Sequence, residues 1–181
     1  YVRHQKLKFQ KMPAANREFN DRRLYACLKS RFESLNYAFK GKSVICLGAR
    51  QGTEVRVFTD FGCLAIGIDL NPGPENKYVV YGDFRDIQYP DNVFDIAYTN
   101  SLDHSWDIIK TIAEILRVVK PGGVLIIDAM EGGRVGQYEA LDWESSDRLI
   151  ELFIKRNCVL MNKFPISQPW SGTCFLLING D

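Results

Sequence analysis

Val44-Ile-Cys-Leu-Gly-Ala-Arg-Gln-Gly-Thr-Glu54, together with Leu64-Ala-Ile-Gly-Ile-Asp69, is the stretch that decides the fold. Residues 44–47 are a short apolar run with two β-branched members, which predicts a buried strand. Gly48 and Gly52 then break the strand and open a helix, which we expect to end at Gly62. A second predicted strand covers residues 64–69 and ends on an acid. Strand, glycine-containing turn, helix, strand and acid in this order are typical of a βαβ unit that binds a nucleoside.

Each part of this unit has a role in holding such a ligand. The turn lets the backbone approach the ligand, the helix N-terminus offers partial positive charge, and the final carboxylate can accept both ribose hydroxyls. Asp69 lies 21 residues after Gly48, which is close to the spacing that this geometry needs. A dinucleotide site usually has G-x-G-x-x-G, whereas Arg50 stands here in place of the middle glycine. The turn alone therefore leaves the class of nucleotide open.

The composition indicates one soluble globular domain. The chain has 181 residues, of which 46% are hydrophobic and 25% charged, and no apolar run approaches the roughly 18 residues of a membrane span. The five cysteines show neither C-x-x-C nor metal-ligand spacing, so we expect buried reduced thiols, no metal site and a cytoplasmic protein. The first residue is Tyr1 rather than Met, so we expect the true N-terminus to lie upstream, and the targeting of a parent protein stays open.

The charge is unevenly distributed. Residues 1–42 carry 11 Lys or Arg against 3 Asp or Glu, and the remainder carries 12 against 19. The basic segment could bind nucleic acid or an acidic membrane face, or it could complement the acidic body or form a solvated helix face. We expect residues 1–40 to be an N-terminal arm and a helix capped by Asn20 or Asp21, and residues 41–181 to form the main domain.

The remaining strands and helices are predicted from the periodicity of the hydrophobic residues and from the residues that interrupt helices and strands. Further strands are expected over residues 78–81, 93–99, 124–128, 158–161 and 173–178. A helix with Ser105 as its cap is expected to end at the Lys120-Pro-Gly-Gly123 segment, and another helix over residues 143–156, with Asn157 as a left-handed cap. The buried face of the first of these helices is predicted to consist of Ile109, Ile112, Ala113, Leu116 and Val119. Residues 131–142 are predicted to form a loop. Only eight residues join the second strand to the third, so we expect a short strand and an extended link.

Five short motifs then occur in a characteristic order. They are Val-Ile-Cys-Leu-Gly-Ala-Arg-Gln-Gly, Ile-Gly-Ile-Asp-Leu, Gly-Asp-Phe, Phe-Asp-Ile-Ala-Tyr-Thr-Asn-Ser-Leu-Asp-His and Arg-Val-Val-Lys-Pro-Gly-Gly-Val-Leu. With these motifs the chain resembles a class I S-adenosylmethionine (SAM)-dependent methyltransferase of the type 11 kind, within the Rossmann-like methyltransferase superfamily. The resemblance covers roughly residues 40 to 130. It implies an α/β three-layer sandwich with a seven-stranded, mostly parallel sheet whose last strand is antiparallel.

The resemblance also implies where SAM would bind. Gly48 and Gly52 would line the turn beside the methionine and ribose parts, and Asp69 would hold the ribose diol. Asp83 and Phe84 would meet the adenine. Asn100 and Ser101 would flank the sulfonium. The cofactor-binding residues implied in this way are Gly48, Ala49, Arg50, Gly52, Asp69, Leu70, Asp83, Phe84, Asn100 and Ser101, and the catalytic candidates are Asn100 and His104.

Several of these residues keep an alternative, purely structural interpretation. Asp69 could end its strand only, and Asp83 could cap a turn. His104 could act as a general base, or it could pack or cap. Trp143 and Trp170 could line an acceptor pocket or anchor the core.

Two residues depart from the family pattern, which usually has an acid at the position of Cys46 and a glycine at that of Arg50. Arg50 could bind the cofactor carboxylate, or it could point away and pair with an acid such as Glu54.

The leading hypothesis is a methyltransferase. We expect its acceptor to be a small molecule, since the loops of the chain are short for a macromolecular substrate. An RNA or protein acceptor, bound through the basic N-terminal segment, is the minority view. The alternatives are a non-catalytic or degenerate SAM-binding module and, with less support, a nicotinamide-dependent Rossmann enzyme.

Overall fold

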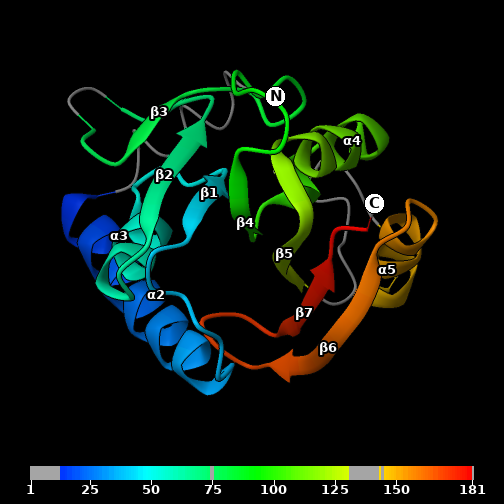
Figure 1. The fold of residues 1–181 in the computed structure, drawn as a ribbon. Coiled ribbons are helices and arrows are strands. Elements are labelled where there is room, and N and C mark those ends of the chain that lie inside the picture. The colour runs from blue at the N-terminus through cyan, green and yellow to red at the C-terminus, as the bar shows by residue number, and fades with distance from the viewer. Residues whose placement is uncertain (1–12, 74–75, 131–142, 144, 181) are drawn as a thin grey trace.

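The computed structural model of the chain describes residues 13–73, 76–130, 143 and 145–180. Within these residues, seven strands form a single sheet in the order β3-β2-β1-β4-β5-β7-β6 (Figure 1). The elements in chain order are α2 (Ala14–Ser34), β1 (Ser43–Leu47), α3 (Thr53–Asp60), β2 (Leu64–Asp69), β3 (Val79–Tyr81), β4 (Phe94–Thr99), the 3-10 helix η1 (Leu102–His104), α4 (Ile108–Val118), β5 (Val119–Met130), α5 (Ser146–Ile154), β6 (Val159–Ile166) and β7 (Gly172–Ile178).

The strand directions confirm the predicted fold class. β1 pairs in parallel with β2 and β4, β2 pairs in parallel with β3, and β4 pairs in parallel with β5. Only β7 is reversed, because it is antiparallel to both β5 and β6. The strand order changes direction between β1 and β4, and open α/β sheets bind ligands at such a switch point, beyond the carboxyl ends of the strands.

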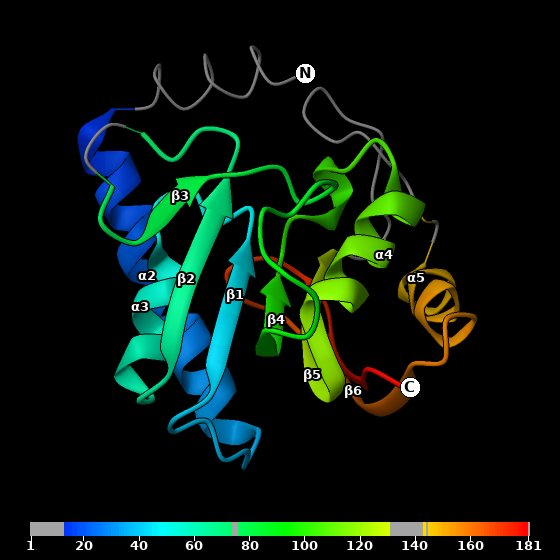
Figure 2. The ribbon, with the colours of Figure 1, turned by 45° about the horizontal axis from the view of Figure 1, so that its top comes forward.

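Helices cover both faces of the sheet, α2 and α3 on one side and α4 and α5 on the other (Figure 2). Alternate residues of β1 pack on opposite faces of the sheet, against the helices of the two layers. Ile45 and Leu47 belong to the core cluster that contains Ile112 of α4, whereas Val44 belongs to the cluster that contains Phe58 of α3. A strand buried on both faces needs apolar residues throughout, which explains the uninterrupted apolar run in the sequence.

Helix α2 begins earlier than predicted and is part of this core. It begins at Ala14, immediately after Pro13, so the prediction of a cap at Asn20 or Asp21 is wrong. Proline is well suited to a helix start because its fixed φ matches the helix and its missing N–H would have no intrahelical partner there. Asp21 lies inside the helix and accepts hydrogen bonds from the Arg56 guanidinium at 2.5 and 2.6 Å.

Two buried side chains attach α2 to the sheet. The Phe32 ring stacks on Phe58 with 4.6 Å between centroids and meets the edge of the Tyr98 ring at 5.4 Å. Arg31, only 8% exposed, forms an ion pair with Asp128 near the end of β5, and the Tyr98 hydroxyl donates to the same carboxylate at 2.8 Å. Burial raises the pKa of Asp128, and the charge of Arg31 opposes that rise.

Helix α4 has a different cap and a different buried face from those predicted. Asp107, rather than Ser105, accepts the Lys110 N–H at 3.0 Å and caps the helix. The Ser105 hydroxyl instead hydrogen-bonds the Thr111 hydroxyl at 2.7 Å. Ile109 is 48% exposed and Ala113 is also exposed. The residues that α4 buries are Thr111, Ile112, Ile115 and Val118. Apolar residues surround more than half of this helix, so periodicity alone could not choose the face that packs.

Other boundaries shift by a few residues. β5 already begins at Val119 and includes the Lys120-Pro-Gly-Gly123 segment, because Val119 pairs with Phe94 before a register shift. Helix α5 begins at Ser146, whereas Trp143 precedes it as a buried residue whose indole N–H donates to Met130 O at 3.3 Å. The predicted left-handed cap at Asn157 is confirmed by its φ of 64°.

The short third strand is also confirmed. β3 has three residues and runs parallel to β2. β6 is longer than the predicted strand over residues 158–161, because it extends to Ile166. The predicted loop 131–142 lies outside the described residues. None of the helices in residues 13–73, 76–130 and 145–180 has both the length and the apolar character of a bilayer crossing.

We predict that Phe32→Ala lowers the free energy of unfolding by about 3–5 kcal/mol, because it leaves a cavity between α2, α3 and the sheet. Urea denaturation measures this change. Phe19→Ala, at a position of the same helix that is 64% exposed, is the control and should change stability by no more than about 0.5 kcal/mol. Equal effects of the two substitutions would contradict the packing of α2 into the core.

Candidate functional site

The carboxyl ends of β1, β2 and β4 meet at one edge of the sheet, and most of the predicted site residues follow these ends. The Gly48 N–H donates to Ile68 O at 2.9 Å, which fastens the glycine turn to β2. The Ser101 N–H donates to the Thr99 hydroxyl at 3.1 Å, which starts the loop after β4. Residues far apart in the chain are thereby brought together, as the βαβ pattern predicts.

Gly48 is required because the loop after β4 closes directly on it. Its φ is +72°, and an added Cβ would lie 2.7 Å from Ser101 Cβ and 2.8 Å from Ser101 Oγ. Phe84, the predicted adenine contact, would be the next neighbour at 3.9 Å. Gly48, Phe84 and Ser101 are therefore adjacent in space, which sequence spacing could not establish.

Gly52, with φ +76°, lies directly against Tyr78, which was not predicted as a site residue. An added Cβ at Gly52 would lie 2.5 Å from Tyr78 Cβ, so Tyr78 covers the end of the glycine turn. Ala49, between the two glycines, is buried against Gly67 of β2.

Asp69 holds the glycine turn to the end of β2. Its carboxylate is 7% exposed, with Oδ2 accepting the Arg50 N–H at 3.2 Å and Oδ1 accepting the Asn71 N–H at 2.6 Å. Leu70, which follows it, is half-buried. A carboxylate has about four lone-pair sites, so these two bonds leave room for hydroxyl donors of a ligand. The strand-terminating role and the ribose-binding role are therefore compatible at Asp69.

Asn76 is a second residue that sequence reasoning missed. Its side-chain amide donates to Arg50 O at 2.9 Å and to Pro72 O at 2.8 Å, and its Oδ1 accepts the Tyr78 N–H at 2.9 Å. One asparagine thus connects the glycine turn to the link before β3. This connection explains how so short a link can join two parallel strands without a crossover helix.

Asp83 is engaged as a turn cap. It accepts hydrogen bonds from the Arg85 backbone N–H at 2.9 Å and from Arg85 Nε at 3.0 Å. The guanidinium carbon of Arg85 lies 3.3 Å from the centroid of the Trp106 ring, so this cation is held from both sides. The geometry supports the structural alternative for Asp83 and leaves its adenine role as a prediction.

A buried carboxyl that was not predicted as a site residue faces the loop after β4. Glu54, in the first turn of α3, is 5% exposed, and its Oε1 accepts a hydrogen bond from Asn100 Nδ2 at 3.2 Å. Asn100 Oδ1 accepts the Ser101 hydroxyl at 2.9 Å, so the amide is oriented with its NH₂ group toward Glu54. Glu54 lies one helical turn before Phe58, and this spacing was a signal that it faces inward.

Burial is the main influence on this carboxyl. It raises the pKa of Glu54 to about 7, with Asp21 and Asp69 adding to the rise and the hydrogen bonds from its own backbone N–H and from Asn100 opposing it. Such a group changes its protonation near neutral pH, whereas an exposed glutamate is fully ionised there.

The structure shows the surroundings of Cys46 and Arg50, the two residues that depart from the family pattern. Cys46 is fully buried, and burial raises the pKa of its thiol well above the usual range, so it is an uncharged group. Arg50 is half-buried in the turn, and none of the ion pairs among the described residues joins it to Glu54. The alternative in which Arg50 pairs with Glu54 is therefore not seen among the described residues, because Glu54 turns inward to Asn100.

The remaining candidates lie beside this site or in the core. His104 ends η1, and its backbone N–H donates to Ser101 O at 3.1 Å, which keeps it close to the loop after β4. Trp143 belongs to the core cluster on the α4 side, and Trp170 packs against the cluster on the α2 side. Within the described residues no group of three or more His, Cys, Asp or Glu side chains is arranged to hold a metal ion.

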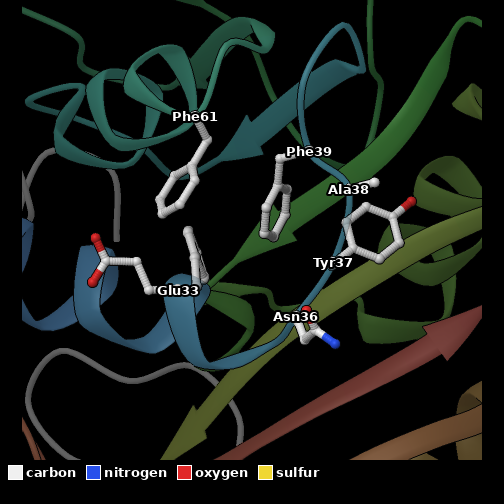
Figure 3. Close-up of a pocket in the computed structure, with 7 residues that line it drawn as sticks. Glu33, Asn36, Tyr37, Ala38, Phe39 and Phe61 are labelled. Atoms are coloured by element: carbon white, nitrogen blue, oxygen red, sulfur yellow. The ribbon is translucent and has the colours of Figure 1, made fainter.

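A pocket of about 410 Å³ lies elsewhere, at the turn between α2 and β1 (Figure 3). Its walls are largely aromatic, and Phe39 and Phe61 stand there with their ring centroids 5.2 Å apart. The residues that line it are Phe32, Glu33, Asn36, Tyr37, Ala38, Phe39 and Phe61. None of these was predicted as a site residue, and the pocket lies near the amino ends of β1 and β2. It is therefore separate from the edge that gathers Gly48, Asp69 and Asn100.

Comparison with known proteins agrees with this geometry. Residues 45–127 match the family model described as "Methyltransferase domain". The resemblance to methyltransferases found in the sequence is therefore confirmed over these residues, which make up a little under half of the chain.

One curated relative is the demethylmenaquinone methyltransferase of Thermobifida fusca. It is 33% identical over 104 residues, which cover 50% of this chain and 44% of the relative. The chain thus spans about half the length of the curated relatives that it matches.

Solved structures share the fold at low sequence identity. A SAM-dependent methyltransferase from Aquifex aeolicus superimposes with a TM-score of 0.71 at 16% identity, over 97% of this chain and 98% of that one. The 1,6-didemethyltoxoflavin-N1-methyltransferase of Burkholderia thailandensis, solved with 1,6-didemethyltoxoflavin and S-adenosylhomocysteine bound, has a TM-score of 0.67 at 18% identity. It covers 86% of this chain and 88% of its own.

The raised pKa of Glu54 predicts a specific dependence of stability on pH. Between its ordinary value of 4.5 and about 7 the folded protein holds a proton that the unfolded chain releases, so stability falls as pH rises through this range. Relative to Glu54→Gln, the wild type should lose up to about 1.4 kcal/mol per pH unit there and then level off. Urea unfolding of both proteins at several pH values measures the difference. A difference independent of pH would contradict the assignment.

Proposed function

We propose that this chain is a methyltransferase that uses SAM and transfers its methyl group to a small-molecule acceptor. The observation that supports this most directly is the junction of three strand ends, where Asp69 accepts the Arg50 N–H and Ser101 closes on Gly48. A nucleoside with an amino-acid extension fits such an edge, because it has hydroxyls for Asp69 and a chain that can follow the turn. The residues present therefore fit SAM.

SAM, when bound, supplies an electrophilic methyl group on a positively charged sulfur. The chain's own contribution is alignment in a site from which water is excluded. In this proposal Gly48, Ala49, Arg50 and Gly52 line the methionine and ribose parts, Asp69 and Leu70 hold the ribose, and Phe84 with Asp83 borders the adenine. Asn100 and Ser101 lie beside the transferred methyl, and His104 is the candidate for proton removal from an acceptor.

A small-molecule acceptor is supported by the relatives, since the Thermobifida fusca protein is named for demethylmenaquinone. We assign the chain to a reducing, cytoplasmic setting because all five cysteines are free and four of them are buried. The basic N-terminal segment keeps an RNA or protein acceptor as the second candidate. A non-catalytic module would bind SAM without transferring its methyl group, and a nicotinamide-dependent enzyme would bind NAD instead of SAM.

Calorimetry with SAM, S-adenosylhomocysteine and NAD tests the proposal, followed by incubation with SAM labelled in its methyl group and a fractionated cell extract. We expect both adenosyl ligands to bind, NAD not to bind, and label to enter the small-molecule fraction. Label in RNA or protein would support the second candidate acceptor. Binding without any transfer would favour the non-catalytic module, and NAD binding without SAM binding would contradict the proposal.

We predict that Asp69→Ala weakens the binding of S-adenosylhomocysteine by about 1.5–3 kcal/mol for each ribose hydrogen bond that is lost. Asp69→Asn keeps one acceptor oxygen and should lie between wild type and Ala. Asp60→Ala, at the exposed far end of α3, is the control and should leave the dissociation constant unchanged. An unchanged constant for Asp69→Ala would show that this carboxylate only terminates its strand.

A further inference from the structure

The Glu54 carboxyl lies in surroundings that favour a positively charged ligand group. The residues that raise its pKa are Asp21 of α2 and Asp69 of β2, and Glu54 in turn raises the pKa of Cys46 in β1 and Tyr98 in β4. None of these four side chains is cationic, and none of the ion pairs among the described residues includes Glu54. Asp21 is itself satisfied by Arg56.

A buried carboxylate without a cation is unfavourable unless something compensates it. Here the protein provides one side-chain donor, Asn100 Nδ2 at 3.2 Å from Oε1. The amide is fixed in this direction because its oxygen accepts the Ser101 hydroxyl. The site thus holds a carboxyl group with acceptor capacity to spare, at the junction of the glycine turn, the start of α3 and the loop after β4.

We propose that Glu54, positioned by Asn100, binds the α-ammonium group at the amino-acid end of the cofactor and makes the site selective for ligands that carry it. The inference rests on the proposed function, since it names a contact to the same cofactor. An ammonium group brings one full positive charge and three N–H donors, whereas the donors that Glu54 has in the protein, the Asn100 amide and its own backbone N–H, are both uncharged.

The proposal also gives a role to the departure at Cys46. The family usually has an acid at that position, at the end of the first strand, and this chain has a neutral thiol there. Burial raises the pKa of the Cys46 thiol, and Glu54 lies close enough to add to this rise. In this chain the first turn of α3, rather than the end of β1, therefore supplies the carboxyl group. The chain therefore keeps one carboxylate at this junction, supplied by a different element.

A thermodynamic cycle tests the proposal. Calorimetry compares S-adenosylhomocysteine with its deamino analogue, in which hydrogen replaces the α-amino group, on the wild type and on Glu54→Gln. We expect Glu54→Gln to weaken binding of S-adenosylhomocysteine at least about tenfold and binding of the analogue less than about twofold, since a hydrogen bond to a charged partner is worth one to two orders of magnitude. Glu151→Gln, an exposed carboxyl of α5, is the matched control and should change neither constant.

Proton release provides a readout that a purely structural glutamate would not change. Near pH 7 part of the free protein holds a proton on Glu54, and an ammonium ligand favours the ionised form. The wild type should therefore release protons on binding S-adenosylhomocysteine but not on binding the analogue, measured as heat that depends on the buffer, and affinity should rise from pH 6 to pH 8. This comparison uses wild-type protein and decides the question even where Glu54→Gln does not fold.

The outcomes separate this inference from the proposed function. Equal affinity of the wild type for the two ligands, or an equal loss for both in Glu54→Gln, overturns the role of Glu54 and leaves SAM binding intact. Failure of the folded wild type to bind S-adenosylhomocysteine contradicts the proposed function itself.

Discussion

The candidate site depends on the close approach of Ser101 to the backbone of Gly48, where no side chain can be accommodated. An added Cβ would be 2.7 Å from its neighbour, well inside the distance at which carbon atoms repel. This contact joins the ends of β1 and β4 on either side of the point where the strand order changes direction. Asn100 directly precedes Ser101 and donates to Glu54 at the start of α3, and Phe84 is the next neighbour of Gly48, so all three are arranged around this contact.

The same edge is reinforced from the side of the N-terminal helix. Arg31 reaches from α2 to Asp128 near the end of β5, and Tyr98 of β4 donates to the same carboxylate. A buried ion pair of this kind adds little net stability compared with apolar packing, but breaking it is expensive because it leaves an unpaired charge. Its effect is to fix the position of α2 relative to β4 and β5.

The sequence predicted the fold well because its signals are local. Strands buried on both faces need continuous apolar runs, and the glycines with positive φ at 48, 52 and 62 mark the turn and the helix end directly. Helix α4 was assigned the wrong cap and the wrong face because its apolar residues cover more than half of its circumference, so tertiary packing had to decide which of them are buried. The site was predicted only in part. The spacing of Glu54 from Phe58 indicated only that it faces inward, and Asn76 and Tyr78 act through contacts with Arg50 and Gly52, which are distant in the chain and leave no short-range pattern.

The single side chain of Asn76 replaces the helix that normally joins two parallel strands. It holds the carbonyl oxygen of Arg50 on one side and the backbone N–H groups of Tyr78 and Val79 on the other. Tyr78, in turn, rests on Gly52. The glycine turn and the edge strand β3 are consequently connected, so a displacement of the sheet edge is transmitted to the glycine turn. In this fold an amide group of a few atoms couples the rim of the sheet to its centre.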